Sequence, residues 1–148
     1  MSAKKQRESS WPNGQVKWRG SFVDGKRNGK WIQWRENGEK QQECHYRAGR
    51  MHGAETYWYA EGWKRRTQWG GGRKHGPETL WHENGQKKEQ GRYRKGKLHG
   101  LWKSWHRNGS KRWERRYRKG VMEGVWIWWN EKGEELGRQF WKEGEVGD

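Results

Sequence analysis

Aromatic, charged and glycine positions return together about every 24 residues along this chain. Each unit carries a short segment bounded by two glycines, and the first glycines of these segments are Gly25, Gly49, Gly72, Gly96 and Gly120. Their spacing is 24, 23, 24 and 24 residues, and a second turn signal such as Asn108-Gly109 lies midway in each unit. So short and regular a period is typical of a repeat protein whose units bury their apolar residues against their neighbours.

One unit, from Gly96 to Gly120, predicts a β-hairpin. Alternating residues over 101–106 and 111–117 predict two strands, and the Asn108-Gly109 turn between them is a strong hairpin signal. Glycines at least every dozen residues exclude long helices. We therefore predict an all-β fold: an elongated single-sheet antiparallel meander of about six ~24-residue β-hairpin repeats, with about twelve strands. The array is expected over residues 11–146, after a flexible polar N-terminus at residues 1–10.

Three aromatic columns follow the repeat. The first column consists of Trp34, Trp58, Trp81, Trp105 and Trp129. The second consists of Phe22, Tyr46, Trp69, Tyr93, Tyr117 and Trp141. The third is interrupted, with Trp31, Trp102 and Trp126 but Glu55 and Glu78 at the equivalent places. Because strand residues three apart point to opposite faces, either a bulge intervenes or one column lies outside. We expect the two unbroken columns to form the core and the interrupted one to be divided between core and surface.

Composition supports a thin, aromatic sheet. Ile, Leu and Val together number 11, against 22 Trp, Tyr and Phe, so large aromatics must supply most of the burial. The single cysteine, Cys44, excludes an intramolecular disulfide and fits a reducing compartment. No apolar segment approaches the length of a membrane span. We expect a soluble, cytoplasmic protein without a transmembrane segment.

The positive charge is concentrated in the middle of the array. The whole chain has a net charge of +16, and residues 63–119 alone carry 19 Lys/Arg and 4 Asp/Glu, a net +15. Residues 1–62 carry a net +5, and residues 120–148 a net −4. If the positive charge served only to keep the surface solvated, it would be spread evenly along the chain. Its concentration in one part favours a local anion-binding region.

The turn Gly96-Lys97-Leu98-His99-Gly100, the aromatic strands and the Asn-Gly turns that follow resemble the MORN repeat, most closely its bacterial variant. The resemblance covers about residues 11–146. It implies a non-catalytic scaffold, an elongated single-layer β array used for protein or lipid contacts, and bacterial members are often described as antitoxin-like. Since one fold hosts many functions, the resemblance does not identify the partner. The chain departs from the family in its many Trp, Arg and Lys residues.

Neither a metal site nor a catalytic site is expected. His52, His75 and His99 recur at one turn position, so successive members lie about 9–10 Å apart, too far to share an ion. Cys44 and His45 are neighbours in a strand and point to opposite faces, so they form no nucleophile–base pair. No phosphate-binding glycine loop precedes a helix. No cofactor is expected.

Basic and aromatic residues interleave in three segments that the meander would place side by side, at 63–69, 87–95 and 111–119. Arg and Lys bind phosphates, and Trp or Arg can stack on bases. Trp63 and Trp113 lie outside the columns, which favours a role in binding, whereas long Lys and Arg stems covering exposed aromatics would be an alternative explanation. The candidate nucleic-acid or anion-binding residues are Trp63, Lys64, Arg65, Arg66, Lys87, Lys88, Arg92, Arg94, Lys111, Arg112, Trp113, Arg115, Arg116 and Arg118.

These residues predict a non-enzymatic binding protein. Its most favoured partner is a nucleic acid, DNA or RNA, or a nucleotide-like polyanion. The alternative is a protein-interaction scaffold, antitoxin-like or inhibitory, that recognises an acidic protein surface. Association with an anionic membrane surface ranks last, because no amphipathic anchor helix is predicted. The open edges of such a sheet also allow a homodimer.

Overall fold

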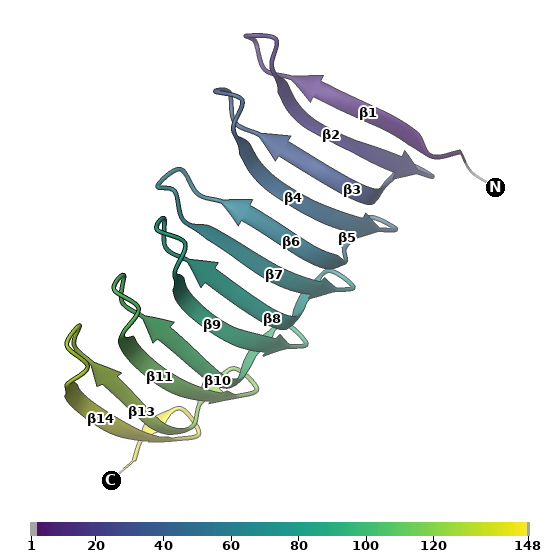
Figure 1. Ribbon diagram of the computed structural model, residues 1–148. Helices are drawn as coiled ribbons and strands as arrows, with labels where there is room; N and C mark the ends of the chain where they lie inside the picture. The colour runs from purple at the N-terminus through teal and green to yellow at the C-terminus, as the bar shows by residue number, and fades with distance from the viewer. Residues whose placement is uncertain (1–2, 148) are drawn as a thin grey trace.

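The structure is a computed structural model that describes residues 3–147 as one antiparallel sheet (Figure 1). Residues 1–2 and 148 lie outside the described part. The strands are β1 (Lys5–Ser10), β2 (Val16–Val23), β3 (Lys26–Trp34), β4 (Lys40–Arg47), β5 (Arg50–Met51), β6 (Gly53–Trp58), β7 (Lys64–Gly70), β8 (Arg73–Trp81), β9 (Lys87–Arg94), β10 (Lys97–Trp105), β11 (Lys111–Arg118), β12 (Val121–Met122), β13 (Gly124–Trp129), β14 (Glu135–Lys142) and β15 (Glu145–Val146). Over residues 3–147 no helix is present.

Strands that are neighbours in the sequence are neighbours in the sheet, apart from the two-residue strands β5 and β12, which pair beside β4 and β11. The predicted all-β meander of hairpins is therefore confirmed. Figure 1 shows a long twisted ribbon with the two termini at opposite ends. The sheet begins earlier than the sequence predicts, because Lys5–Ser10, expected in a flexible segment, pair with β2 as strand β1.

In each segment bounded by two glycines, the chain turns at the first glycine and then continues as a strand. Lys95 and Gly96 both have positive φ, at 50° and 83°, which is typical of the two-residue turn that joins antiparallel strands with the natural twist. The strand then resumes, and the second glycine, Gly100, lies inside β10 opposite Tyr117. The second column of aromatics thus faces a glycine on the neighbouring strand, which leaves room for each ring.

Successive hairpins are also joined through the turns at both ends of the strands. One row of turns contains the glycine turns, and we call this side of the sheet the glycine-turn edge; there the N–H of Gly96 donates to the carbonyl of Lys74 at 2.8 Å. The other row contains the Asn-Gly turns, and there Nδ2 of Asn84 donates to the carbonyl of Arg107 at 2.9 Å. Both contacts recur in other repeats, so the period that sets the hairpins also fixes each one to the next.

The most buried side chains belong to the interrupted column, which corrects our assignment of the core. Trp31 and Trp102 are each 2% exposed, and the carboxylates Glu55 and Glu78 are also buried. Cross-strand pairing places these residues, with Cys44 and Thr67, in one row on one side of the sheet, here called the core face. The second aromatic column lies half-buried on the same face.

The first column lies on the opposite face. Trp58 pairs across the strands with Lys64, while the adjacent Tyr57 pairs with Arg65 on the core face. Side chains alternate along a strand, so Trp58 and its equivalents point away from the core face. These tryptophans are half-buried rather than core residues, and the expectation that they form the core is wrong.

Glycines beside the buried tryptophans explain why the interrupted column can pack so closely. Trp102 lies over Gly91, where an ideal Cβ would be 2.5 Å from Cγ of the indole and nearer still to other ring atoms. The indole Nε1 of Trp102 donates to the carbonyl of Arg92 at 3.2 Å. Trp31 lies over Gly20 in the same way. The residue eleven positions before each fully buried tryptophan is thus a glycine.

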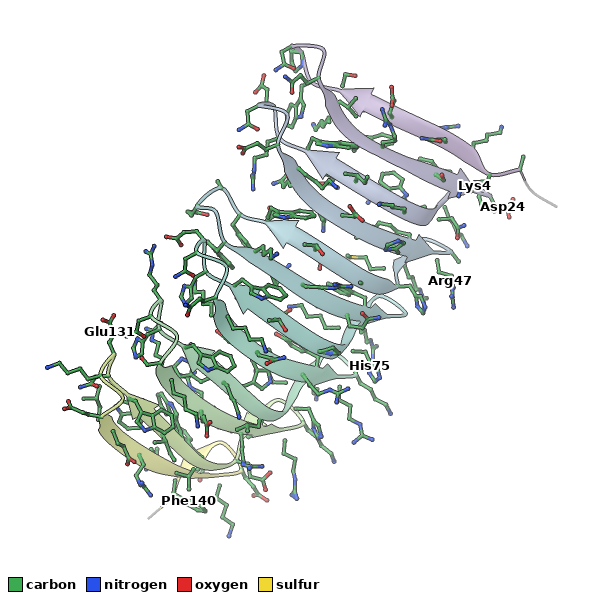
Figure 2. The ribbon with its side chains drawn as sticks, in the orientation of Figure 1. Lys4, Asp24, Arg47, His75, Glu131 and Phe140 are labelled. Carbon is green, nitrogen blue, oxygen red and sulfur yellow. The ribbon has the colours of Figure 1, made fainter. Side chains whose placement is uncertain are left out.

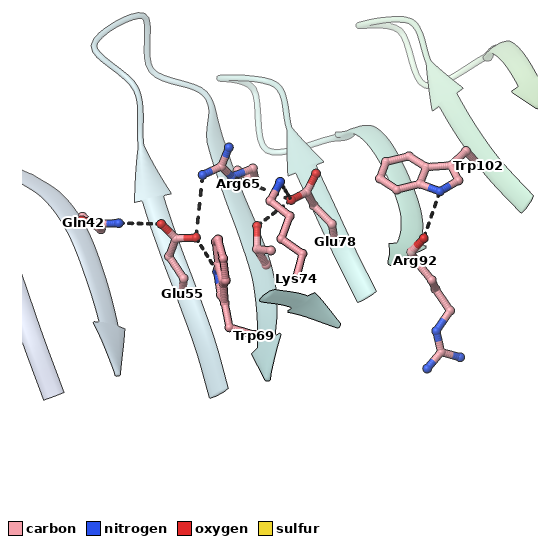
Figure 3. Close-up of polar contacts among 9 residues, drawn as sticks. Gln42, Glu55, Arg65, Trp69, Lys74, Glu78, Arg92 and Trp102 are labelled. Atoms are coloured by element: carbon pink, nitrogen blue, oxygen red, sulfur yellow. Dashed lines mark hydrogen bonds and ion pairs between the residues drawn. The ribbon is translucent and has the colours of Figure 1, made fainter. Parts of the chain in front are cut away.

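In two repeats where that residue is not glycine, a buried carboxylate takes the place of the tryptophan (Figure 3). Cys44 precedes Glu55 and Thr67 precedes Glu78 by eleven residues. The hydroxyl of Thr67 and the ammonium of Lys74 both contact Oε2 of Glu78, each at 2.7 Å. Buried carboxylates require such partners, so this part of the core is a hydrogen-bonded polar cluster.

Candidate nucleic-acid interface

The alternation of side chains divides the predicted site between the two faces. Lys64, Arg66, Lys87, Arg92, Lys111 and Arg116 alternate with core-face residues of β7, β9 and β11 and lie on the opposite side. We call this side the basic face and define it by these six residues together with Lys103. The predicted residues therefore do not form one band: half of the predicted cations lie together on this face, and the two predicted stacking tryptophans lie elsewhere.

Cations of the basic face are largely free of internal partners. Within residues 3–147, Lys64, Arg66, Arg92 and Arg116 form no ion pair. Arg92 and Arg116 lie on the two strands that flank β10, where Arg92 pairs with His99 and Arg116 pairs with Leu101. Two strand spacings separate them by about 9–10 Å. Because no acid neutralises these cations, their charge can act on an external anion.

The acid near this surface is Glu114 of β11. It accepts contacts from Lys111 at 2.9 Å and from Lys103 at 3.7 Å. Both pairs are partly exposed to solvent, so each contributes little to stability and can exchange with a phosphate.

A groove of 500 Å³ crosses strands β8, β9 and β10 on the basic face. Arg92, Lys103 and Trp105 line it together with Gln90 and Leu101. Trp105 is also one of a series in which a lysine from the preceding repeat lies over a tryptophan ring: the ammonium of Lys87 is 6.0 Å from its centroid. The groove thus places an aromatic ring, two cations and an amide within one surface.

The predicted residues Trp63, Arg65 and Lys88 lie on the core face. Trp63 stacks on Tyr59 with ring centroids 3.4 Å apart, and the ammonium of Lys88 lies 4.4 Å from the Trp63 ring. Arg65 lies between the buried carboxylates, 3.7 Å from Glu55 and 4.0 Å from Glu78 (Figure 3). Its charge is therefore used inside the protein, which argues against a role in phosphate binding.

Trp113, Arg112 and Arg115 lie in a second groove, of 520 Å³, on the core face near the C-terminal hairpin. The guanidinium of Arg115 is 4.2 Å from the ring centroids of both Trp113 and Trp126. Leu136, which also lines this groove, is 61% exposed. This surface is richer in aromatic rings than the basic face, and its cation Arg115 packs on two of them.

The last two predicted residues, Arg94 and Arg118, end their strands at the glycine-turn edge, the side of the sheet on which Figure 2 labels Arg47 and His75. Sequence reasoning missed Lys103 and Trp105. Trp105 belongs to the first aromatic column, which the sequence predicts to lie in the core. A count of cations at alternate strand positions would have pointed to Lys103.

Burial on the core face raises the pKa of two ionisable side chains, Cys44 and Glu89. Burial raises the pKa of the Cys44 thiol to about 11, and the nearby Glu55 carboxylate adds to the effect. Burial also raises the pKa of Glu89, with a further contribution from Glu78. Among residues 3–147, no three His, Cys, Asp or Glu side chains gather closely enough to hold a metal ion.

Comparison with known families agrees with this architecture. A family model described as MORN repeat variant matches residues 27–48, 74–95 and 98–118, which correspond to hairpins β3–β4, β8–β9 and β10–β11. The chain is a MORN-type repeat protein. A search of curated proteins found no match. Two of the matched MORN repeats contain Arg92, Lys103 and Arg116, so the basic face is built on the regular repeat frame.

Repeats of this kind suggest a binding function, and the fold alone does not name the partner. Within residues 3–147, no helix has the length and apolar character needed to cross a bilayer.

Proposed function

We propose that this MORN-type protein is a non-enzymatic binding protein whose basic face holds a nucleic acid. The observation that carries the proposal is the set of cations without internal partners on one side of β7, β9 and β11. Lys64, Arg66, Arg92 and Arg116 form no ion pair with any residue in 3–147. Cations on a regular sheet are spaced along its length, which suits an extended chain of phosphates.

Aromatic residues on the same face favour a nucleic acid over a simple polyanion. Trp105 lines the groove beside Arg92 and Lys103, and Trp81 occupies the equivalent place one repeat earlier. Bases stack on exposed aromatic rings without sequence preference, while neighbouring cations hold the backbone. The ring of Trp105 and the unpaired guanidinium of Arg92 supply these two contacts in one groove.

The direct test compares two double charge reversals in the full chain. Arg92→Glu with Arg116→Glu changes the basic face, and Lys132→Glu with Lys142→Glu makes the same change in net charge at exposed residues outside it. Fluorescence anisotropy with labelled single-stranded RNA and DNA measures the affinity. We expect the first variant to bind at least about tenfold more weakly and the control to change by less than about threefold.

Two outcomes would argue against the proposal. An equal loss in both variants would mean that net charge alone attracts the nucleic acid, without a defined surface. Wild-type protein that binds neither oligonucleotide, and that purifies without nuclease or high salt at a protein-like ratio of absorbance at 260 and 280 nm, would exclude a nucleic-acid partner.

A second candidate function is supported by the groove on the core face. Trp113, Arg115 and Trp126 form an aromatic and cationic cluster beside the exposed Leu136. Tryptophan and arginine dominate binding energy at protein interfaces, so this groove suits a protein partner. A Trp113→Ala variant should leave oligonucleotide binding unchanged, since Trp113 lies on the opposite side from the basic face.

A further inference from the structure

A second cationic surface lies at the glycine-turn edge, next to the basic face: Arg94 and Arg118 follow Arg92 and Arg116 by two residues in the same strands. Here a groove of 650 Å³ crosses three successive turns. Its lining consists of Arg73, Arg94, Lys95, Lys97, His99, Arg118 and Lys119, with no acidic side chain. We propose that this groove is a separate site for a linear polyphosphate, a chain of linked phosphates without bases.

Stacking of the turns brings the cations together. Each turn glycine lies against the first residue of the strand one repeat earlier: the Cβ position of Gly96 is 3.8 Å from Cβ of Arg73, and that of Gly120 is 3.5 Å from Cβ of Lys97. Lys95 and Lys119 precede these glycines in their turns. The cations of three consecutive turns therefore form one row along the edge of the sheet.

The lysines in these turns occupy an unusual backbone conformation. Lys95 and Lys119 each have φ of 50°, in the left-handed region where Gly, Asn and Asp are most favourable. Gly71 stands at the equivalent position one turn earlier. Asp24, Ala48 and Glu143 share this conformation at the equivalent position of other turns, so the conformation belongs to the turn and the lysines are distinguished by their charge.

The charge pattern of the edge limits the site to these turns. The equivalent turn position is Asp24 at the N-terminal end and Glu143 at the C-terminal end, so acids replace the lysines at both ends of the array. Within residues 3–147, one cation of the groove has an ion-pair partner: Arg118, at 3.1 Å from Glu123. The remaining cations keep their full charge for a ligand.

The shape of the groove favours a chain of phosphates over a single phosphate or a nucleotide. Successive hairpins are about 9–10 Å apart, so one phosphate reaches the cations of one turn, whereas a linear chain reaches those of all three. His99 is the one ring that lines the groove, which therefore offers no tryptophan or tyrosine on which a base could stack. Recognition is left to charge, which suits a ligand that carries charge at every unit.

Lysine-to-glycine changes in the turns test this site without disturbing the fold. Glycine adopts positive φ at no cost, and Gly71 shows that the turn accepts it, so Lys95→Gly with Lys119→Gly should fold normally. Lys132→Ala with Lys142→Ala is the matched control that removes two charges elsewhere. Titration calorimetry of the full chain uses three probes: orthophosphate, tripolyphosphate and a polyphosphate long enough to span the three turns.

We expect affinity for wild-type protein to rise from orthophosphate to tripolyphosphate to the long chain. The Lys95→Gly/Lys119→Gly variant should bind the long chain at least about tenfold more weakly, and the control less than about threefold. Trp105→Ala, which removes a ring from the basic face without changing the charge, should keep the long-chain affinity within about threefold. This last result separates the site from the proposed nucleic-acid surface, because either can fail alone.

Three results would overturn the proposal. They are the absence of polyphosphate binding, equal binding by the turn variant and wild-type protein, and loss of binding in Trp105→Ala. ATP that binds much more tightly than tripolyphosphate would also contradict it, since that difference would show recognition of a base.

Discussion

Gly91→Ala tests whether the interrupted column is the core of the sheet. The new Cβ would overlap the indole of Trp102, which is 2% exposed and rigid. If Trp102 left its place, the sheet would lose the burial of about 150–250 Å², or about 4–6 kcal/mol at about 25 cal/mol per Å². Displacement of the neighbouring strands costs less, about 1–3 kcal/mol, so this response should dominate. We therefore expect a loss of about 2–3 kcal/mol in unfolding free energy.

Gly70→Ala is the matched control. Gly70 ends β7 with a φ outside the positive range, and an added Cβ would lie 3.5 Å from Cβ of His75, an ordinary contact. Other repeats carry side chains at this place, such as Arg94 and Arg118. Alanine there should be neutral or slightly stabilising.

Thermal and urea unfolding, followed by tryptophan fluorescence, would measure both variants. We expect the melting temperature of Gly91→Ala to fall by about 5–10 °C and that of Gly70→Ala to stay within about 3 °C of wild type. If the two variants unfold alike, Trp102 does not pack on Gly91 and our assignment of the core face fails.

Two further predictions concern the faces of the sheet. Burial raises the pKa of Glu89 above its ordinary value of 4.5, so the folded state binds this proton more tightly than the unfolded state. Its contribution to stability is lost as pH rises from the ordinary pKa through the raised one. Glu89→Gln should therefore be more stable than wild type at pH 7 in urea unfolding, with the difference vanishing in acid below the ordinary pKa; a difference independent of pH would refute this. Trp105→Ala should weaken single-stranded oligonucleotide binding about fivefold or more, because stacking on one base contributes about 1–3 kcal/mol. Trp63→Ala, on the core face, should leave oligonucleotide binding unchanged. If Trp63→Ala weakened binding and Trp105→Ala did not, Trp63 would be the stacking residue, as the sequence predicts.

The fold could be predicted from the sequence because the repeat is local. Turn glycines at a fixed spacing, with Asn-Gly midway between them, define hairpins without knowledge of distant contacts. The core could not be predicted with the same success. The unbroken Trp105-type column looked like the core, but burial depends on the residue across the strand, and Gly91 and Gly20 make room for Trp102 and Trp31.

The candidate site was predicted in its charge but not in its geometry. The excess of cations in residues 63–119 is real, yet alternation sends Arg65 to the buried carboxylates and Arg66 to the basic face. Adjacent residues in a strand thus have opposite roles, and a segment treated as one basic unit conceals this. Trp105 escaped notice because a residue can be both a repeat position and part of a binding surface.

The salt dependence of oligonucleotide affinity tests the central claim most directly. For a single strand, the logarithm of the binding constant falls with the logarithm of the salt concentration by about 0.7 per phosphate contact. If four or more cations of the basic face contact phosphates, the slope for wild-type protein should be about −3 or steeper. Arg92→Glu/Arg116→Glu should reduce its magnitude by about 1.4 or more. A slope near zero, or one that this variant leaves unchanged, would contradict nucleic-acid binding by the basic face.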